Sequence, residues 1–316
     1  MNTPLVSIIC ATYNHVPYIR QCLEGFMMQQ TTFPFEVLIH DDASTDGTTE
    51  IVQEYERKYP DIIKPVYQKE NQYSKGIRIF PTYVYPKSKG KYYALCEGDD
   101  YWTDPYKLQK QVDFLEAHPD YSLVYTEYQI YTQCNGTFTK PGRKIYEGNV
   151  YKYILRQKVR CQTLTVCFRR KVKDHIPQMP ADCFKGDLAL FLTASLIGKF
   201  KYLPDVTSVY RVLPQSASHF LTKREADEFH SSLYKLVIFF CRKYPLPHKS
   251  DNNHIIKKAY YKITLANLSA NEYSKMAEVR FMFFPFLPFN RTMYCLLCKN
   301  RHLFHLFAAI EARKKE

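Results

Sequence analysis

Three carboxylates lie within four residues of one another, at Glu97, Asp99 and Asp100, directly after the apolar run 92–95. An apolar run of this kind is typical of a buried strand, which places the carboxylates at a strand end. Closely spaced carboxylates repel one another, and a cation relieves that repulsion. Mg²⁺ and Mn²⁺ prefer oxygen ligands and usually take one or two protein carboxylates together with water and phosphate oxygens. The cluster therefore indicates a divalent metal site, although an acidic loop that merely begins a helix has the same composition.

Two further polar clusters follow apolar runs upstream. The run 5–11 leads into the polar segment 12–14, and the run 35–39 leads into the polar segment 40–48. Apolar residues at helical spacing separate these runs. Alternating strands and helices predict right-handed βαβ units and a parallel sheet, in which ligands bind outside the carboxyl ends of the strands. We therefore expect the three polar clusters to share one crevice. Further along the chain, the patterns at 163–169 and 206–212 predict two more strands.

These residues give the chain a family resemblance over roughly residues 4 to 220. The chain resembles the family 2 glycosyltransferases of the GT-A fold, which move a sugar from a nucleotide donor. The matching segments are Val6 to Asn14, Asp41 to Thr48, Glu97 to Asp100, Gly186 to Leu188, and Tyr210 to Val212. The resemblance implies an α/β fold with a Rossmann-like, mixed and mainly parallel sheet flanked by helices. Since the matches end near residue 220, we expect a catalytic domain at 1–220, and the composition beyond it predicts a basic, aromatic-rich helical extension at 221–316.

On the donor side, the resemblance makes Asp99 the ligand of a Mn²⁺ or Mg²⁺ ion that bridges the diphosphate of a nucleotide sugar. Asp42 matches the carboxylate that accepts a hydrogen bond from the ring N–H of the base, and a UDP-sugar is the expected donor. Glu97 stands where the family more often has Asp, so its side chain reaches further by one methylene group. The other residues expected around the nucleotide are Thr12, Tyr13, Asn14 and Asp41.

On the acceptor side, the resemblance makes Asp187 the general base of an inverting transfer to a hydroxyl of a glycan or lipid-linked acceptor. Gly186 stands where many members have a first acidic residue, and Asp187 would serve equally well as a helix cap. Arg211 is expected to pair with the diphosphate or with Asp187, and His219 is a further candidate for phosphate or metal contact. Trp102 is interpreted either as an acceptor platform or as a core residue.

Composition adds expectations about location and partners. The ten cysteines are scattered, several of them inside apolar runs, which indicates reduced thiols in the core. A strand pattern from residue 5 leaves no room for a signal peptide, and the apolar runs are shorter than the ~20 residues that span a bilayer. We therefore expect a cytoplasmic protein.

The charge of the chain is concentrated near its C-terminus. The formal net charge is +13, and residues 221–316 carry 17 Lys and Arg against 8 Asp and Glu. With the aromatic run 281–289, this basic segment predicts peripheral contact with an anionic membrane surface, unless it simply packs on the catalytic domain. No nucleic-acid motif accompanies the basic charge, so nucleic acid is not an expected partner.

Other classes of protein and of site stay open or are disfavoured. A sugar-phosphate nucleotidyltransferase would need a glycine-rich phosphate loop after the first strand, and residues 12–17 contain no glycine. A non-catalytic nucleotide-sugar-binding scaffold on the same fold stays open. A zinc site formed by Cys295, Cys298, His302 and His305 is disfavoured, because their spacing is too short to fold two arms around one metal ion.

Overall fold

The computed structural model describes the chain except for residues 1–2, 160, 181–182, 184–185, 214–221 and 270–316. The chain divides into two compact units. The first comprises Met1–Gln178 with Gly186–His219, and the second comprises Met179–Lys185 with Phe220–Glu316. The aromatic run 281–289, the candidate zinc residues 295–305 and His219 lie outside the described residues.

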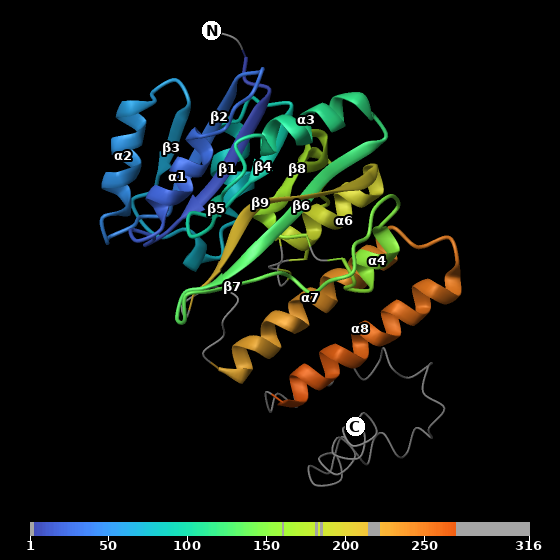
Figure 1. The fold of residues 1–316 in the computed structure, drawn as a ribbon. Coiled ribbons are helices and arrows are strands. Elements are labelled where there is room, and N and C mark those ends of the chain that lie inside the picture. Colours follow the sequence, from blue (N-terminus) through green and yellow to red (C-terminus); the bar gives the residue numbers. More distant parts are fainter. Residues whose placement is uncertain (1–2, 160, 181–182, 184–185, 214–221, 270–316) are drawn as a thin grey trace. The chain divides into compact units, whose positions relative to one another are not determined.

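The first unit is built on one sheet, with the strand order β3-β2-β1-β4-β8-β6-β9-β5 and with β7 paired to β6 (Figure 1). Strands β3, β2, β1 and β4 are parallel, β8 is antiparallel to both β4 and β6, and β6 is parallel to β9. This mixed sheet confirms the expected βαβ units. The strands are β1 (Val6–Thr12), β2 (Phe35–Asp41), β3 (Ile63–Tyr67), β4 (Tyr92–Leu95), β5 (Tyr101–Trp102), β6 (Tyr121–Thr132), β7 (Thr137–Thr139), β8 (Val166–Arg169) and β9 (Lys199–Val212).

Helices cover this sheet. One core joins the apolar stripes of α1, α2 and α3 to inward side chains of β1, β2 and β4. On the other side of β2, the ring of Tyr83, from the irregular segment 73–87, stacks on His40. Helix α6 packs against β6 and β9, and α4 packs against α6. The α-helices of the first unit are α1 (Ile19–Met27), α2 (Thr48–Lys58), α3 (Lys107–Ala117), α4 (Tyr151–Leu155), α5 (Lys171–Asp174) and α6 (Gly186–Ile197).

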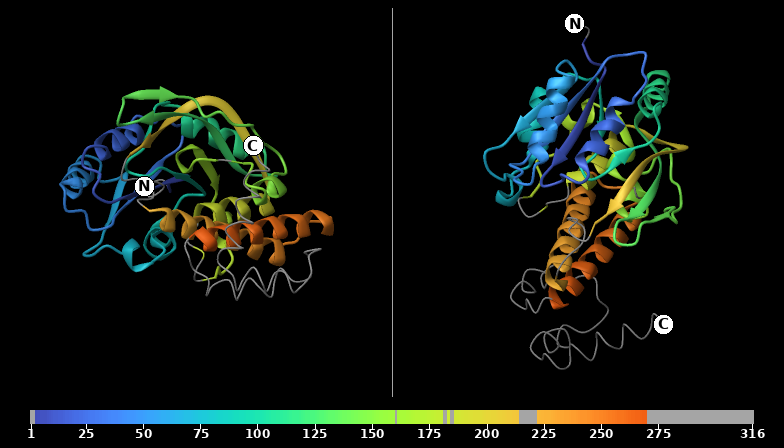
Figure 2. Two further views of the ribbon diagram at one scale, coloured as in Figure 1. Left: turned by 90° about the horizontal axis from the view of Figure 1, so that it is seen from below. Right: turned by 60° about the vertical axis from the view of Figure 1, so that its left-hand side comes forward.

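Two strands differ from the pattern in the sequence. The strand expected at 206–212 is the end of the longer β9, which runs beside β6 (Figure 2). The pairing of these two strands shifts register near Glu127. The strand expected at 163–169 is shorter: β8 begins at Val166, and Thr163–Thr165 form a 3₁₀ turn. The turn forms because the hydroxyl and the N–H of Thr165 both bond back to the carbonyl of Gln162 (2.7 and 3.0 Å).

Most of the described part of the second unit is a pair of helices, α7 (Lys223–Lys243) and α8 (Lys249–Ser269), which pack against each other. Helix α7 begins with a capping box, in which the Thr222 hydroxyl accepts from the N–H of Glu225 and the Glu225 carboxylate accepts from the N–H of Thr222. Among the described residues, no helix is long and apolar enough to cross a membrane.

Candidate active site

The three polar clusters meet at the carboxyl ends of β1, β2 and β4, as expected. Backbone pairing continues past the strand ends: the N–H of Asp42 donates to the carbonyl of Thr12 (3.0 Å), and the N–H of Gly98 donates to the carbonyl of Ala11 (2.8 Å). Because β1 lies between β2 and β4, both neighbouring loops are fastened to its end. The sequence places each cluster at a strand end, and the parallel sheet brings the ends together.

Gly98 is required by this close approach. A Cβ atom at position 98 would lie 2.7 Å from Oγ1 of Thr12 and 3.0 Å from Nδ1 of His15. Real Cβ atoms do not come this close to heavy atoms, so a side chain here would push the acidic turn away from β1. The glycine lets Glu97 and Asp99 lie directly beside the segment 12–15.

The segment after β1 is held by the loop after β2. Asn14 adopts a left-handed conformation (φ +54°), which asparagine tolerates better than most residues. Its Oδ1 accepts from the N–H of Thr45 (2.9 Å), and its N–H donates to Oγ of Ser44 (3.0 Å). Tyr13 is 43% exposed, whereas Thr12 is buried. Asn14 therefore organises the loop, and Tyr13 is the member of this segment with a free aromatic surface.

The two aspartates at the end of β2 bond to different partners. Asp41 is buried, and its oxygens accept from the N–H of Ser44 (3.1 Å) and the hydroxyl of Thr49 (2.5 Å), which shapes the turn into α2. Asp42 is also buried, and its oxygens accept from the N–H groups of Gln72 (2.8 Å) and Tyr73 (2.9 Å). Each carboxylate oxygen of Asp42 keeps a second lone pair for another donor. Asp42 thus fixes a loop at the strand edge and can still accept a hydrogen bond.

His40 is a neighbour of Asp42 that the sequence did not single out. Its side chain is fully buried, its Nε2 lies 4.0 Å from Oδ1 of Asp42, and neither ring nitrogen has a hydrogen-bond partner among the described residues. Burial lowers the pKa of His40, while Asp42 and Asp41 act in the opposite direction. His40 therefore lies beneath Asp42 as a largely uncharged, polarisable group at neutral pH.

The three carboxylates of the acidic turn have different surroundings. Burial raises the pKa of Glu97 to about 7, and the negative charges of Asp99 and Asp187 add to that rise. A hydrogen bond from the Thr163 hydroxyl to Oε2 of Glu97 (2.6 Å) acts in the opposite direction. Burial, followed by the charges of Asp99 and Glu97, raises the pKa of Asp100 well above its usual value. Asp99 is more exposed than Asp100 and is the better placed of the two to meet a ligand.

Arg211 supports the acidic turn from the end of β9. Its guanidinium lies over the rings of Tyr101 (4.5 Å) and Tyr18 (5.1 Å) and donates to the backbone carbonyl of Asp99 (2.6 Å). A second nitrogen of the same group bonds to Gln21, and the backbone N–H of Arg211 donates to Oδ1 of Asp100 (2.7 Å). These contacts hold Asp99 and Asp100 in place; pairing of Arg211 with a diphosphate stays a prediction.

Asp187 lies in the first turn of α6 and is exposed. Its charge contributes to the raised pKa of Glu97, so the two carboxylates lie within electrostatic reach of each other. Residues 184 and 185, which precede this helix, are outside the described part of the chain. Asp187 is therefore near enough to Glu97 for their charges to interact, and its role as general base or helix cap stays a prediction.

Trp102 is a core residue, and its interpretation as an exposed acceptor platform is wrong. The side chain is only 2% exposed, and its Nε1 donates to the carbonyl of Leu164 (2.9 Å). Its ring meets Phe26 edge to face, with 4.9 Å between centroids. A Cβ atom at Gly25 would lie 2.9 Å from the backbone nitrogen of Trp102, so α1 packs directly on β5.

The side chains of this edge fit a metal ion shared with a substrate. The described residues contain no group of three or more His, Cys, Asp or Glu side chains that could hold a metal ion by themselves. Mg²⁺ and Mn²⁺ are commonly held by one or two carboxylates, with phosphate oxygens and water completing the shell. The partly exposed carboxylate of Asp99 suits this arrangement.

Comparison with known proteins identifies the family. Residues 7–173 match glycosyl transferase family 2. An uncharacterised protein of Mycobacterium tuberculosis is 34% identical over 206 residues, which cover 65% of this chain and 58% of the relative, so the similarity spans little more than half of that protein's length. The Escherichia coli enzyme WfaP, named as a UDP-Glc:α-D-GlcNAc-diphosphoundecaprenol β-1,3-glucosyltransferase, is 32% identical over 219 residues, covering 68% of this chain and 80% of WfaP.

A solved structure shares the fold. The mannosyltransferase PcManGT of Pyrobaculum calidifontis, determined with GDP-mannose and Mn²⁺, superimposes with a TM-score of 0.57 at 20% sequence identity. The superposition covers 96% of this chain and 81% of PcManGT. The family match shows that the chain belongs to glycosyl transferase family 2, and the superposition shows that it has the fold of the GT-A glycosyltransferases.

Proposed function

We propose that the protein is an inverting glycosyltransferase that moves a sugar from a nucleotide-diphosphate donor, a UDP-sugar, to a hydroxyl of a glycan or lipid-linked acceptor. The observation that carries this proposal is the arrangement of Asp99 and Glu97 beside Thr12, with Asp187 within electrostatic reach of Glu97. The proposed metal ligand Asp99, the residues expected to line the nucleotide and the candidate base Asp187 would then belong to one site. The catalytic domain would comprise residues 1–220.

Asp99 would hold a Mn²⁺ or Mg²⁺ ion that neutralises the leaving diphosphate as a Lewis acid. The chain supports this role by fixing the backbone of Asp99 through Arg211 (2.6 Å) and by keeping a small residue at Gly98. Thr12, Tyr13, Asn14, Asp41 and Asp42 would line the nucleotide, with Asp42 accepting from a ring N–H of the base.

Asp187 would take the proton of the acceptor hydroxyl while that hydroxyl attacks the sugar from the face opposite the leaving group. An exposed carboxylate in the first turn of a helix is open to an incoming acceptor. WfaP is named for a UDP-glucose donor and a diphosphoundecaprenol acceptor, which supports a UDP-sugar and a lipid-linked acceptor for this chain. Such an acceptor fits the synthesis of a surface polysaccharide.

A lipid-linked acceptor would place the protein at the inner face of the cell membrane. The basic surplus of residues 221–316 suits reversible contact with anionic lipid, because each Lys or Arg near such a surface contributes about 1 kcal/mol. Co-sedimentation of the full chain with anionic and with neutral vesicles tests this part of the proposal. Equal binding to both vesicles would contradict it.

The central experiment is a screen of UDP-glucose, UDP-GlcNAc and GDP-mannose, each with and without Mn²⁺. We expect a metal-dependent thermal shift with one UDP-sugar and slow release of UDP from it. A non-catalytic scaffold would give the shift without hydrolysis. With added pyrophosphate, a nucleotidyltransferase would instead convert the UDP-sugar to UTP and a sugar 1-phosphate.

A further inference from the structure

The turn Thr163–Thr165 touches the candidate active site although no motif marks it. Its first residue, Thr163, is partly exposed, and its hydroxyl donates a 2.6 Å hydrogen bond to Oε2 of Glu97, 66 residues earlier in the chain. The two residues that follow, Leu164 and Thr165, are fully buried. The turn therefore has one side in the core and one hydroxyl at the acidic cluster.

Buried side chains anchor the turn from the core side. Nε1 of Trp102 donates to the carbonyl of Leu164 (2.9 Å), and Nε2 of Gln111 donates to the carbonyl of Thr165 (2.8 Å). Trp102 and Gln111 are themselves 2% and 0% exposed, so both anchors are held by packing. A backbone held at two successive carbonyls cannot shift without breaking buried hydrogen bonds, each of which is unfavourable to lose.

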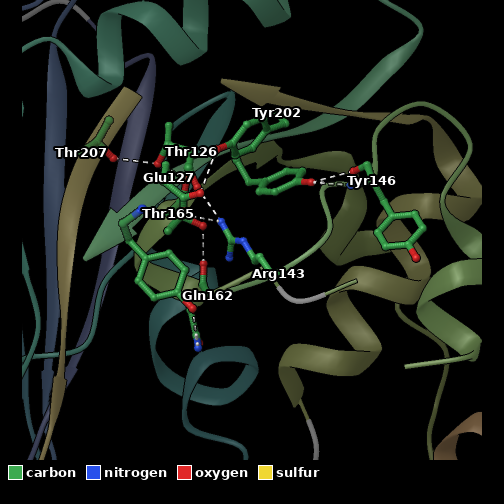
Figure 3. A network of polar contacts seen from close by, with 10 residues as sticks. Thr126, Glu127, Arg143, Tyr146, Gln162, Thr165, Tyr202 and Thr207 are labelled. Carbon is green, nitrogen blue, oxygen red and sulfur yellow. Dashed lines mark hydrogen bonds and ion pairs between the residues drawn. The ribbon is translucent and has the colours of Figure 1, made fainter. Parts of the chain in front are cut away.

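A second group of contacts supports the turn from β6 (Figure 3). The hydroxyl of Thr126 lies 3.4 Å from the carbonyl of Thr165 and 2.7 Å from the hydroxyl of Thr207. At the next residue of β6, the carboxylate of Glu127 pairs with Arg143 (2.9 Å) and accepts from the hydroxyl of Tyr202 (2.9 Å). This network joins β6, β9 and the segment around Arg143 beneath the turn.

The length of the Glu97 side chain explains why a fixed hydrogen-bond donor at Thr163 matters. A glutamate has one more rotatable bond than an aspartate, so an unsupported Glu97 carboxylate would sample more positions at the strand end. The hydrogen bond from Thr163 selects one of them. Preorganised groups of this kind depend on neighbouring residues whose own positions are fixed by packing and hydrogen bonds.

We propose that Thr163 is a positioning residue for sugar transfer, whose hydroxyl holds the Glu97 carboxylate in its productive orientation at the carboxyl end of β4. The proposal rests on the transferase function proposed above and adds a residue to it. Thr163 acts through Glu97 and does not itself need to touch the donor. Trp102 and Gln111 then contribute to function although they lie in the core, because they fix the turn that carries Thr163.

The test compares Thr163→Val, which removes the hydroxyl at nearly constant volume, with Thr163→Ser, which keeps it. On the UDP-sugar that the parent hydrolyses with Mn²⁺, we expect Thr163→Val to lower kcat by about 10-fold, the scale of a lost hydrogen bond to a charged group. KM for the donor should stay within about 2-fold, because Thr163 does not itself touch the donor. Thr163→Ser should restore most of kcat.

Thr31 offers a matched control. Its hydroxyl also donates a 2.6 Å hydrogen bond, to the carbonyl of Phe33, at the opposite end of β2 from the polar clusters. Thr31→Val should leave kcat unchanged even if its melting temperature falls as far as that of Thr163→Val. If kcat falls in proportion to melting temperature in both variants, Thr163 is only a structural residue and the proposal is wrong.

A double-mutant cycle tests whether Thr163 affects kcat through Glu97. Glu97→Asp shortens the side chain so that it no longer reaches Thr163, and Thr163→Val should then lower kcat no further in that background. Independent, multiplying effects would overturn the proposal. An active parent with a fully active Thr163→Val overturns this inference alone, whereas a parent that hydrolyses none of the nucleotide sugars overturns it together with the proposed function.

Discussion

The edge proposed to line the nucleotide, formed by residues 12–14 and 41–48, and the turn Thr163–Thr165 meet the same acidic cluster but are built differently. At the nucleotide edge, side chains bond to the backbone of the adjacent loop, as when Asn14 accepts from Thr45 and Asp42 accepts from Gln72. These loops follow neighbouring parallel strands, so their proximity comes from the βαβ repeat. The turn instead depends on contacts with Trp102, Gln111 and Thr126, which lie on β5, α3 and β6. A repeated unit builds one region, and long-range packing builds the other.

This difference predicts which residues can be substituted with little loss of activity. Loops of the nucleotide edge are held by several bonds to nearby backbone, so the loss of a single side chain leaves others in place. The turn Thr163–Thr165 instead relies on residues far away in the chain, namely Trp102, Gln111 and Thr126. The largest effects on chemistry should therefore come from Asp187 and the acidic turn, and smaller ones from the residues that pack beneath them.

The largest expected effect is that of Asp187→Asn. Asparagine keeps the size of the side chain and can cap a helix, but it cannot accept a proton at neutral pH. We expect transfer to fall by at least ~10²-fold, the scale of a lost general base, while donor affinity stays near that of the parent. Steady-state kinetics and donor titration measure the two quantities. Transfer at close to the parent rate would show that Asp187 is only a helix cap.

The next largest effect should come from Asp99→Asn. The amide removes the charge that attracts the cation, so UDP with Mn²⁺ should stabilise the variant no more than UDP alone does. Thermal shift with and without Mn²⁺ measures this, and far-ultraviolet circular dichroism checks that the fold is intact. Metal-dependent shifts of equal size in parent and variant would exclude Asp99 as the ligand.

A smaller effect, on stability and site geometry together, is expected from Gly98→Ala. The new methyl group would lie within 2.8 Å of Thr12 and must displace either β1 or the acidic turn. Overpacking of this kind lowers the free energy of unfolding by about 1–3 kcal/mol. Chemical denaturation measures the loss, and Gly142→Ala is a control, because a Cβ there meets no atom within 4 Å. Equal stability of the two variants would contradict the close approach.

The smallest expected effect concerns Lys107, a fully buried lysine that contacts Trp102 and Gln111, the two residues that anchor the turn Thr163–Thr165. Its Nζ donates to Oε1 of Gln111 (2.7 Å) and lies 4.3 Å from the centre of the Trp102 ring. Burial lowers the pKa of Lys107 to about 8, below its ordinary value of 10.5. The unfolded chain therefore binds more protons between these two values, so this lysine makes stability rise as pH increases from about 8 to about 10.5.

Lys107→Met should remove that rise and stabilise the protein at pH 7 by about 1 kcal/mol, since the lost hydrogen bond to Gln111 offsets part of the gain. Urea unfolding of parent and variant at pH 7, 8.5 and 10 measures the difference. The advantage of the variant should shrink as pH rises. An advantage that stays constant or grows would mean that Lys107 is not the titrating group.

Much of the fold could be predicted from the sequence, because buried parallel strands appear as continuous apolar runs. The runs 5–11 and 35–39 became β1 and β2, and the polar residues after them lie at the strand ends as expected. The strands of the antiparallel half were harder to predict. Strand β9 begins seven residues before the predicted start at 206, and β8 begins three residues after the predicted start at 163. The side chains in the first half of β9 are mostly only partly buried, so the sequence shows no regular apolar alternation there.

The sequence by itself determined which residue types stand at the carboxyl ends of β1, β2 and β4, because strand periodicity and the position of each polar cluster are local properties of the chain. Only the tertiary structure decided that Trp102 is buried under the turn, that Arg211 lies between Tyr18 and Tyr101, and that Thr163 reaches Glu97. The partners of Arg211 and Glu97 lie 112 and 66 residues away along the chain. Packing of the sheet's second half brings them together, and no local pattern encodes that packing.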